Sequence, residues 1–265
     1  DAVIEVTEHD EVFTSATEPS WLNTVLGPNM LGSDGAPHRR QKDALQPSFA
    51  HMVKALERER EVRAAARFEQ GRRALMRKDP RLAAVIKATG KRRPDFSPRD
   101  PFRALVRAVL SQQLSTKAAD TIEARVHALV GGREHLAADA LLALSPEALR
   151  AAGVSRPKIA YLRDLAGRVA EGTLDLHGLQ HRPDADVIAA ITAIKGFGVW
   201  SAEMFLMFCL HRSDVFPVGD LGIVKGVQAL TGMKRRPKPR TMTRVADAWR
   251  PHRSIASWYL WRLLE

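Results

Sequence analysis

Helical periodicity, which runs from Met52 to the end of the chain, constrains the fold more than any other feature of the sequence. Within 101–111 the apolar residues recur at i, i+3, i+4, i+7 and i+8, the spacing of a helix with one buried face. No stretch alternates apolar and polar residues as a half-buried strand does. The sequence therefore predicts an all-α fold, built as a helical bundle.

Local signals mark several helix ends. Ser145 is typical of an N-cap, Pro146 of the first helical turn, and Gly153 of the left-handed position just after a helix. Two further helices are expected over 157–170 and 184–193.

The distribution of charge indicates a polyanionic partner for the larger part of the chain. The net charge is +11. Asp1–His51 holds eight acidic and three basic residues (net −5), so Met52–Glu265 holds 22 acidic and 38 basic residues (net +16). Such an excess favours nucleic acid or an acidic membrane surface.

Other counts narrow the protein class. Cys209 is the only cysteine, which excludes an intramolecular disulfide and a four-cysteine iron–sulfur cluster. The longest apolar stretch, Ala202–Leu210, is interrupted by Glu203 and is shorter than the ~20 residues that a membrane span needs. The first ten residues lack the basic start and apolar centre of a secretory signal. We therefore expect a cytoplasmic protein that does not enter a membrane.

Residues 1–51 differ in kind from the rest, and a boundary is expected near His51–Met52. The stretch 30–35, followed by His38-Arg39-Arg40 and by 45–49, resembles the N-terminal part of a cytochrome P-450 type monooxygenase. The cysteine-bearing haem loop of such an enzyme has no room in this chain, so no haem chemistry is expected. A fused fragment and an ordinary N-terminal extension remain as interpretations, and neither predicts an independent function.

A turn with two glycines separates the predicted helix 184–193 from the one that runs through Leu210. Gly196 and Gly198 permit positive φ and the close approach of another backbone. The N–H groups at the start of the second helix lack intrahelical partners and attract a phosphate. A simple helix–helix turn is the alternative, and a lone pair of glycines does not decide between the two.

The segment 194–202, Ile-Lys-Gly-Phe-Gly-Val-Trp-Ser-Ala, resembles the hairpin of helix-hairpin-helix DNA glycosylases. In that family an aspartate follows at the start of a later helix, and Asp220 occupies this place within Val-Phe-Pro-Val-Gly-Asp-Leu. The resemblance continues at 110–115 and 249–254, covers roughly 79–265, and is similar to the 3-methyladenine glycosylase II branch. It implies two helical lobes with a cleft between them and assigns residues 52–265 to the glycosylase.

The resemblance implies a DNA-repair enzyme that hydrolyses the N-glycosidic bond of alkylated bases in duplex DNA. Asp220 would be its catalytic carboxylate, because an anion stabilises the oxocarbenium-like sugar and orients or deprotonates water. A purely structural N-cap aspartate is the alternative, although one residue can do both. An alkylated purine already carries positive charge and leaves as a neutral base, so a second acid is not demanded.

Trp200 indicates whether the chain resembles the strand-nicking or the purely hydrolytic glycosylases. Strand-nicking glycosylases with a similar hairpin carry a lysine immediately before the Ser/Thr-Ala pair, and here that place is tryptophan. The missing amine predicts simple hydrolysis without lyase activity. Lys195 lies in the turn itself and is expected to face phosphate or solvent.

An extruded base needs aromatic walls, and Trp200 is the first candidate because an indole face also attracts a cationic base. Trp258 and Trp261 are expected in the core. The other candidates for the base pocket are Met204, Leu221, Phe102, Trp249 and His252. For Trp249 and His252, a place in the core is an equal alternative.

The loop 112–114 looks like the one that enters the minor groove in this family, with Gln113 or Leu114 as the wedge. A polar turn capped by Ser111 or Ser115 is the alternative. The residues expected to contact DNA are Gly196, Gly198, Lys195, Gln112, Gln113, Leu114, Ser115 and Arg253. The resemblance also implies a Na⁺ or K⁺ ion held by the backbone carbonyls of Thr192, Ile194 and Gly196.

We therefore expect a monomer that acts on damaged duplex DNA without haem or an iron–sulfur cluster. A non-catalytic helix-hairpin-helix module that only binds DNA is the alternative. Asp220 argues against it, because a carboxylate beside a polyanion weakens binding.

Overall fold

The computed structural model describes residues 36–97 and 99–265, and the side chains of 36–53 and 57 are left out of the description. All regular structure in this part of the chain is helical, with no strand, which confirms the predicted all-α class. The helices before the hairpin are α3 (Ala36–Lys78), α4 (Pro80–Thr89), α5 (Pro101–Ser111), α6 (Thr116–Leu129), α7 (Ala138–Ala143), α8 (Pro146–Ala151), α9 (Arg156–Ala170) and α10 (Asp184–Thr192), with the 3-10 turns η1 (Arg133–His135) and η2 (Gly178–His181). After the hairpin come α11 (Val199–Phe208), α12 (Leu221–Thr231), α13 (Pro239–Asp247) and α14 (Arg253–Arg262).

The helix ends follow the predicted local chemistry. The Ser145 hydroxyl accepts a hydrogen bond from the Ala148 N–H at the start of α8, and Gly153 adopts φ +99° just after that helix. The expected segments 101–111, 157–170 and 184–193 correspond to α5, α9 and α10.

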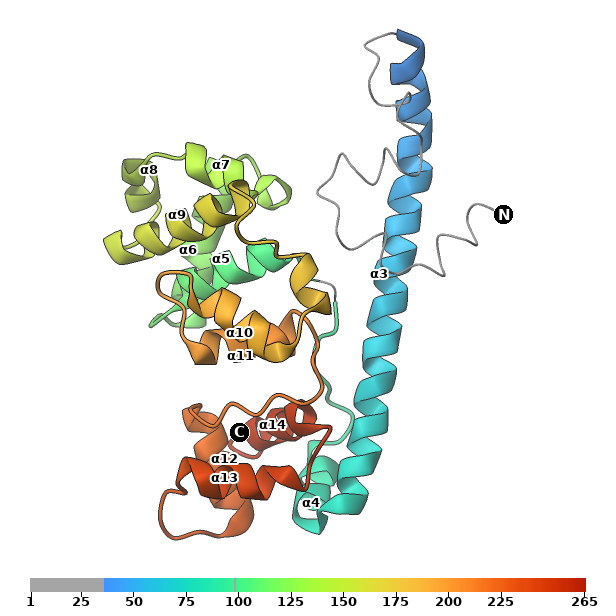
Figure 1. Ribbon diagram of the computed structural model, residues 1–265, viewed down its shortest axis with the longest axis vertical. Coiled ribbons are helices and arrows are strands. Elements are labelled where there is room, and N and C mark those ends of the chain that lie inside the picture. Colours follow the sequence, from blue (N-terminus) through green and yellow to red (C-terminus); the bar gives the residue numbers. More distant parts are fainter. Residues whose placement is uncertain (1–35, 98) are drawn as a thin grey trace.

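The helices form two lobes with separate apolar cores, as the family resemblance implied (Figure 1). The first lobe comprises α5 to α11, and its core includes Leu105, Leu162 and Leu206. The second lobe joins α4 with α12 to α14, so it is assembled from two distant parts of the chain. Trp261 packs against both cores and marks the place where the lobes meet.

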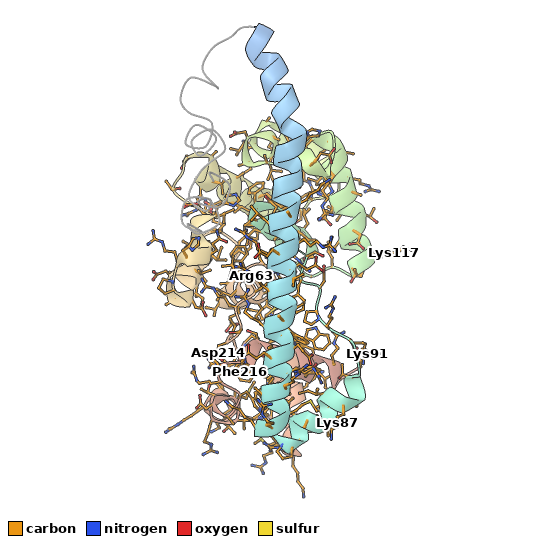
Figure 2. All side chains as sticks on the ribbon, turned by 90° about the vertical axis from the view of Figure 1, so that its right-hand side faces the viewer. Arg63, Lys87, Lys91, Lys117, Asp214 and Phe216 are labelled. Carbon is orange, nitrogen blue, oxygen red and sulfur yellow. The ribbon has the colours of Figure 1, made fainter. Side chains whose placement is uncertain are left out.

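Helix α3 crosses the expected boundary at His51–Met52 without interruption. Its C-terminal part belongs to the second lobe, because Phe68 and Leu75 are buried in that core. The helix lies along one side of the molecule, where Figure 2 shows it from the outside with Arg63 near the level of the lobe junction. Residues 1–35, which carry most of the monooxygenase-like segment, lie outside the described residues.

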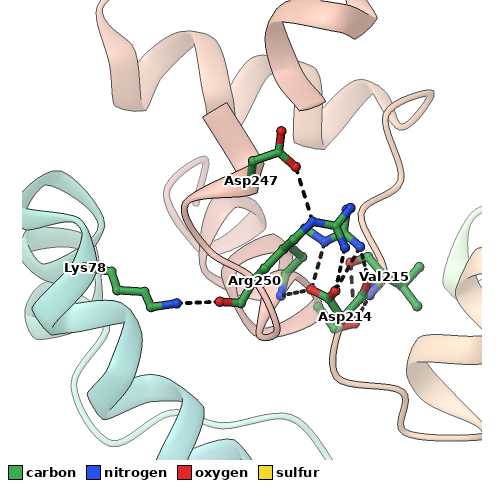
Figure 3. Close-up of polar contacts among 7 residues, drawn as sticks. Lys78, Asp214, Val215, Asp247 and Arg250 are labelled. Atoms are coloured by element: carbon green, nitrogen blue, oxygen red, sulfur yellow. Dashed lines mark hydrogen bonds and ion pairs between the residues drawn. The ribbon is translucent and has the colours of Figure 1, made fainter. Parts of the chain in front are cut away.

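An ion-pair cluster fixes the segment that leads from α11 to α12 (Figure 3). Arg253, at the start of α14, donates from Nε and Nη2 to the two carboxylate oxygens of Asp214 at 2.8 and 2.9 Å. Arg250 adds a further contact of 3.1 Å to Asp214, and the Lys78 ammonium at the end of α3 donates to the Arg250 carbonyl. This cluster holds the connecting segment against α14 immediately before Asp220.

Among the described residues, no helix is both long and apolar enough to cross a membrane.

Candidate functional site

Asp220 is the N-cap of α12, and three N–H groups from three parts of the fold converge on its carboxylate. Oδ1 accepts from the Ile223 backbone N–H at 2.8 Å and from Trp261 Nε1 at 2.9 Å. Oδ2 accepts from Trp200 Nε1 at 2.8 Å. A carboxylate, which only accepts, satisfies all three donors. The predicted N-cap role is therefore real, and the two indole contacts add an arrangement that capping does not require.

The contact between Trp261 and Asp220 depends on a glycine. A Cβ on Gly222 would lie 2.7 Å from Cδ1 and 2.9 Å from Nε1 of the Trp261 ring, and 3.0 Å from Asp220 Oδ1. Because real Cβ atoms do not approach this closely, only glycine lets the indole lie over the first turn of α12. The position of Trp261 is thus set by α12 as well as by its own helix.

The hairpin between α10 and α11 has the predicted tight turn. Gly196 adopts φ +82°, and a Cβ there would lie 2.2 Å from the ring of Tyr161 in α9. Both the dihedral angle and the space require glycine at this position. Gly198 is extended with φ −111° and has open space around it, so its absent side chain leaves the backbone accessible.

The start of α11 has unpaired backbone donors. No side chain caps this helix. Among the described residues, no acceptor is found for the N–H groups of Gly198, Val199 and Trp200. These groups lie where the helix dipole favours an anion, which is the geometry that a DNA phosphate would use. The Lys195 side chain is 70% exposed nearby, as predicted for a residue that faces phosphate or solvent.

A cleft of about 1440 Å³ opens beside the hairpin and is lined on one side by Trp200, Ser201 and Met204 of α11. Residues of α5, α6 and α9 also line it, together with Asp95, Ser97, Arg99 and Asp100. All of these residues belong to the first lobe or lead into it. This cleft therefore lies at the border of the first lobe, and a second cavity of about 340 Å³ is lined by residues of both lobes, among them Met207 and Trp258.

Asp220 is partly exposed and lies behind Trp200 rather than among the residues that line the cleft. Trp200 is itself 51% exposed, so the wall between the cleft and the carboxylate is a single indole with an open face. Leu221, the next residue, is 55% exposed beside the carboxylate and does not line the cleft.

The loop between α5 and α6 lies against the hairpin. Gln112 Nε2 donates to the Gly196 carbonyl at 2.9 Å, and Gln112 and Gln113 both line the cleft. Gln113 has φ +56° and Leu114 is 41% exposed. Ser115 caps α6 by accepting from the Ala118 N–H, which confirms the alternative interpretation for that residue.

Three predicted pocket residues are elsewhere. Phe102 is buried in the first core, and Trp249 is fully buried in the second, where its Nε1 donates to Asp79 at 3.1 Å. His252 is the N-cap of α14 and lies against Gly71 of α3. Trp249 thus takes the core position that was its alternative, and none of the three residues lines the cleft.

Two other assignments also change. Arg253 was expected at DNA, yet its side chain is only 15% exposed and forms the ion pair with Asp214 described above. Trp258 is buried in the core as predicted, whereas Trp261 is partly exposed and contacts the central carboxylate. Trp261 does pack against both cores, as a partly buried residue, and its N–H to Asp220 is the feature that the sequence did not predict.

Glu203 is a residue of the site that sequence reasoning missed. It lies on α11 one turn after Trp200 and is half-buried, and the negative charge of Asp220 opposes the ionisation of its carboxyl group. Burial is the larger cause and Asp220 the smaller one that together raise the pKa of Glu203 to about 7. The available signal was a single carboxylate that interrupts the apolar stretch Ala202–Leu210.

In the described ranges, no group of three or more His, Cys, Asp or Glu side chains is arranged to hold a metal ion.

The comparisons with known proteins agree with this geometry. A family model described as "HhH-GPD superfamily base excision DNA repair protein" matches residues 106–251, just over half of the chain. The chain is 32% identical over 187 residues to DNA-3-methyladenine glycosylase 1 of Schizosaccharomyces pombe, covering 69% of this chain and 82% of that protein. It is 31% identical over 173 residues to DNA-3-methyladenine glycosylase 2 of Escherichia coli, covering 61% of this chain and 57% of that protein.

Solved structures show the same similarity. The crystal structure of a DNA-3-methyladenine glycosidase from Bacillus halodurans matches 71% of this chain and 86% of its own, with 40% identity and a TM-score of 0.65. A 3-methyladenine DNA glycosylase of Schizosaccharomyces pombe, solved in complex with abasic DNA, matches 73% of this chain and 95% of its own, with 30% identity and a TM-score of 0.64.

Proposed function

The chain belongs to the helix-hairpin-helix GPD superfamily of base excision DNA repair proteins, and from this premise we propose that it is a monofunctional DNA glycosylase for alkylated bases. It hydrolyses the N-glycosidic bond in duplex DNA and leaves an abasic site. The observation that carries the proposal is the Asp220 carboxylate, held by two indoles, one of which, Trp200, lines the cleft beside the glycine hairpin.

The hairpin and the loop 112–114 would hold the DNA. A phosphate accepts from the free N–H groups at the start of α11, and this contact fixes the strand next to Asp220. Gln113 or Leu114 enters the minor groove and fills the space of the extruded nucleotide. Lys195 adds electrostatic attraction from the turn.

Asp220 would act on the sugar and on water. As the glycosidic bond breaks, positive charge develops on the sugar, and the carboxylate stabilises it while orienting or deprotonating the attacking water. The three N–H donors fix the carboxylate in place before the reaction begins, so little reorganisation is needed. Trp200 and Met204 form the wall against which an alkylated, cationic base stacks.

The absence of lyase chemistry is part of the proposal. Trp200 stands where strand-nicking relatives carry a lysine, and its N–H is committed to Asp220. Lys195 is the lysine of the hairpin turn itself. Its side chain is 70% exposed, and its Nζ lies 4.0 Å from Asp164 Oδ1. The Lys158 amine also lines the cleft, but it donates to the Leu110 carbonyl at 2.7 Å. The hairpin position from which strand-nicking relatives form a Schiff base with the sugar therefore has no amine.

A Na⁺ or K⁺ ion at the hairpin carbonyls also belongs to the proposal. Carbonyl oxygens suit a hard cation, and each has a second lone pair. The Ile194 carbonyl accepts from the Phe197 N–H and the Gly196 carbonyl from Gln112, so both keep one lone pair for an ion. Bound there together with Thr192, the ion would add positive charge toward a phosphate.

The experiment is an analysis of products from methylated duplex DNA. We expect chromatography to find free methylated purines, and gel electrophoresis to find strands that break only after alkali treatment. Strands cut without alkali would contradict the monofunctional assignment. Tight DNA binding with no released base would instead favour a module that only binds DNA.

A further inference from the structure

Helix α9 contacts both of the loops that would hold the DNA. Lys158 Nζ donates to the Leu110 carbonyl, in the last turn of α5, at 2.7 Å. Asp164 Oδ2 accepts from the backbone N–H of Lys195, in the hairpin, at 2.9 Å. One side chain of α9 therefore reaches the start of the loop 112–114, and another reaches the hairpin. The function proposed above gives these two contacts no role.

The same side of α9 carries a third contact. Tyr161 lies three residues from each of those two side chains, and residues three apart on a helix are neighbours. Its ring stands 2.2 Å from the point where a Cβ on Gly196 would lie, so the hairpin backbone rests directly against it. The other side of the helix is anchored, because Leu162 and Leu165 are fully buried in the first core. Helix α9 is therefore a rigid support with one row of side chains directed at the loop and the hairpin.

The loop after α5 needs such a support. Gln113 adopts φ +56°, a conformation that is unfavourable for a residue with a Cβ and persists only where the surroundings hold it. Its neighbour Gln112 is held by the hydrogen bond to the Gly196 carbonyl. The Leu110 carbonyl belongs to the last turn of α5, where carbonyls lack intrahelical partners, so the Lys158 ammonium caps this helix end and fixes the start of the loop. Backbone strain of this kind is typical of segments that act on a ligand.

We propose that Lys158 and Asp164 are positioning residues for base extrusion, which fix the loop 112–114 and the hairpin at a set distance from each other. This inference rests on the proposed function, in which the hairpin binds a phosphate while Gln113 or Leu114 fills the space that the nucleotide leaves. The two loops act on the same stretch of duplex, so a displacement of either one lowers the fraction of nucleotide that stands outside the helix. Bond cleavage at Asp220 follows extrusion and does not itself use α9.

The test compares wild type with Lys158→Met on two duplexes, in single-turnover reactions with saturating enzyme. Both duplexes contain 7-methylguanine, which is paired with cytosine in one and lies opposite an abasic-site analogue in the other, where extrusion breaks no base pair. Methionine keeps a similar length and an apolar stem but cannot donate. We expect Lys158→Met to lose about tenfold or more in excision rate on the paired lesion, the effect of one lost hydrogen bond from a charged group, and to stay within about threefold on the unpaired lesion.

Two further variants serve as controls for this comparison. Lys158→Arg can still donate to the Leu110 carbonyl, so it should keep the rate on the paired lesion within about threefold of wild type. Lys117→Met removes an exposed lysine in the first turn of α6 and should lose rate on neither duplex.

Fluorescence gives a readout of extrusion that does not depend on bond cleavage. A 2-aminopurine placed next to the lesion brightens when its neighbour leaves the stack, so the amplitude reports the extruded fraction. Lys158→Met should give a smaller increase than wild type on the paired duplex, and Lys158→Arg should restore it. A purely structural role would instead lower the unfolding temperature and reduce both excision rates equally.

Asp164 offers a matched pair of variants for the hairpin. Asp164→Asn keeps an oxygen that can accept from the Lys195 N–H, whereas Asp164→Ala removes it. We expect Asp164→Ala to show the same difference between the two duplexes as Lys158→Met, and Asp164→Asn to stay within about threefold of wild type on both.

The outcomes separate this inference from the proposed function. Equal losses on both duplexes, or an unchanged rate and fluorescence on the paired lesion, would overturn the role of Lys158 while the glycosylase function stands. If wild type releases no base from either duplex, the proposed function fails. In that case the fluorescence amplitude still decides whether Lys158 positions the loop, because extrusion is measured without excision.

Discussion

Asp220 illustrates how one side chain takes part in both the fold and the chemistry. Its bond to the Ile223 N–H stabilises the start of α12, its bond to Trp200 joins the two lobes, and its bond to Trp261 links α12 to α14. Hydrogen bonds to a charged group contribute more than those between neutral groups. The two indoles therefore hold the carboxylate in a defined orientation, and that orientation is what catalysis requires.

Trp261→Phe tests this orientation at the level of one atom. Phenylalanine keeps most of the packing against both cores but removes the N–H that Asp220 Oδ1 accepts. A lost hydrogen bond to a charged group corresponds to about 1.5–3 kcal/mol, so we expect the excision rate to fall about tenfold or more. Single-turnover kinetics on DNA that contains 7-methylguanine measure this excision rate. Trp258→Phe, in the neighbouring core, should lower the unfolding temperature without this loss of rate; an equal loss in both variants would contradict the role of Trp261.

At the scale of elements, the hairpin between α10 and α11 depends most strictly on glycine for its backbone conformation. Gly196 needs positive φ and has the Tyr161 ring where a Cβ would stand, whereas Gly198 has neither restriction. The two glycines of one motif therefore serve different purposes. Gly196 shapes the turn, and Gly198 leaves the start of α11 open.

Substituting each glycine by alanine separates these purposes. Gly196→Ala should destabilise the protein by about 1–3 kcal/mol, the usual range for strained backbone, and lower its unfolding temperature. Gly198→Ala should leave the unfolding temperature nearly unchanged. Calorimetry of both variants provides the comparison, and equal destabilisation would show that the turn does not depend on Gly196 in the way described.

The elements were predictable from the sequence to a large extent, and their contacts much less. Apolar spacing and capping residues such as Ser145 act locally, so α5, α8, α9 and α10 could be predicted. The side of a helix that borders a cleft is decided by packing partners distant in sequence. For that reason the sequence left Trp249 open between pocket and core, and it did not predict that Trp261, which packs against both cores, also donates to Asp220. Asp220 was predicted from the resemblance of the hairpin and the following segment to the family, because local signals alone indicate only a tight turn and an N-cap aspartate.

At the scale of the whole molecule, the connection between α11 and α12 fixes the position of one lobe relative to the other. Arg253 and Asp214 fix this connection to α14, and the Lys78–Arg250 contact joins α3 to the same point (Figure 3). Asp220 follows directly after this segment. The relative position of the cleft and the carboxylate therefore depends on an ion-pair cluster whose residues do not line the cleft.

Salt dependence of DNA binding distinguishes Arg253 from a residue that contacts DNA. Lys195→Met removes an exposed charge beside the hairpin and should reduce the slope of log K against log salt by about 1. Arg253→Met leaves Asp214 with less compensation, so it should lower stability by about 1–3 kcal/mol and leave that slope unchanged. Fluorescence anisotropy at several salt concentrations, with thermal unfolding, measures both. A reduced slope for Arg253→Met would restore it as a phosphate contact.

The most direct test of the central claim compares two aspartates that share one structural role. Asp79 is the N-cap of α4, accepts from backbone N–H groups and from the Trp249 indole, and lies in the second lobe away from the cleft. Single-turnover excision of 7-methylguanine is measured for Asp220→Asn and Asp79→Asn, with DNA affinity alongside. Asp220→Asn should lose at least about a hundredfold in rate while still binding DNA, and Asp79→Asn should lose stability but keep the rate of the folded enzyme. Unchanged excision by Asp220→Asn, or equal losses in both variants, would contradict the assignment of Asp220 as the catalytic carboxylate.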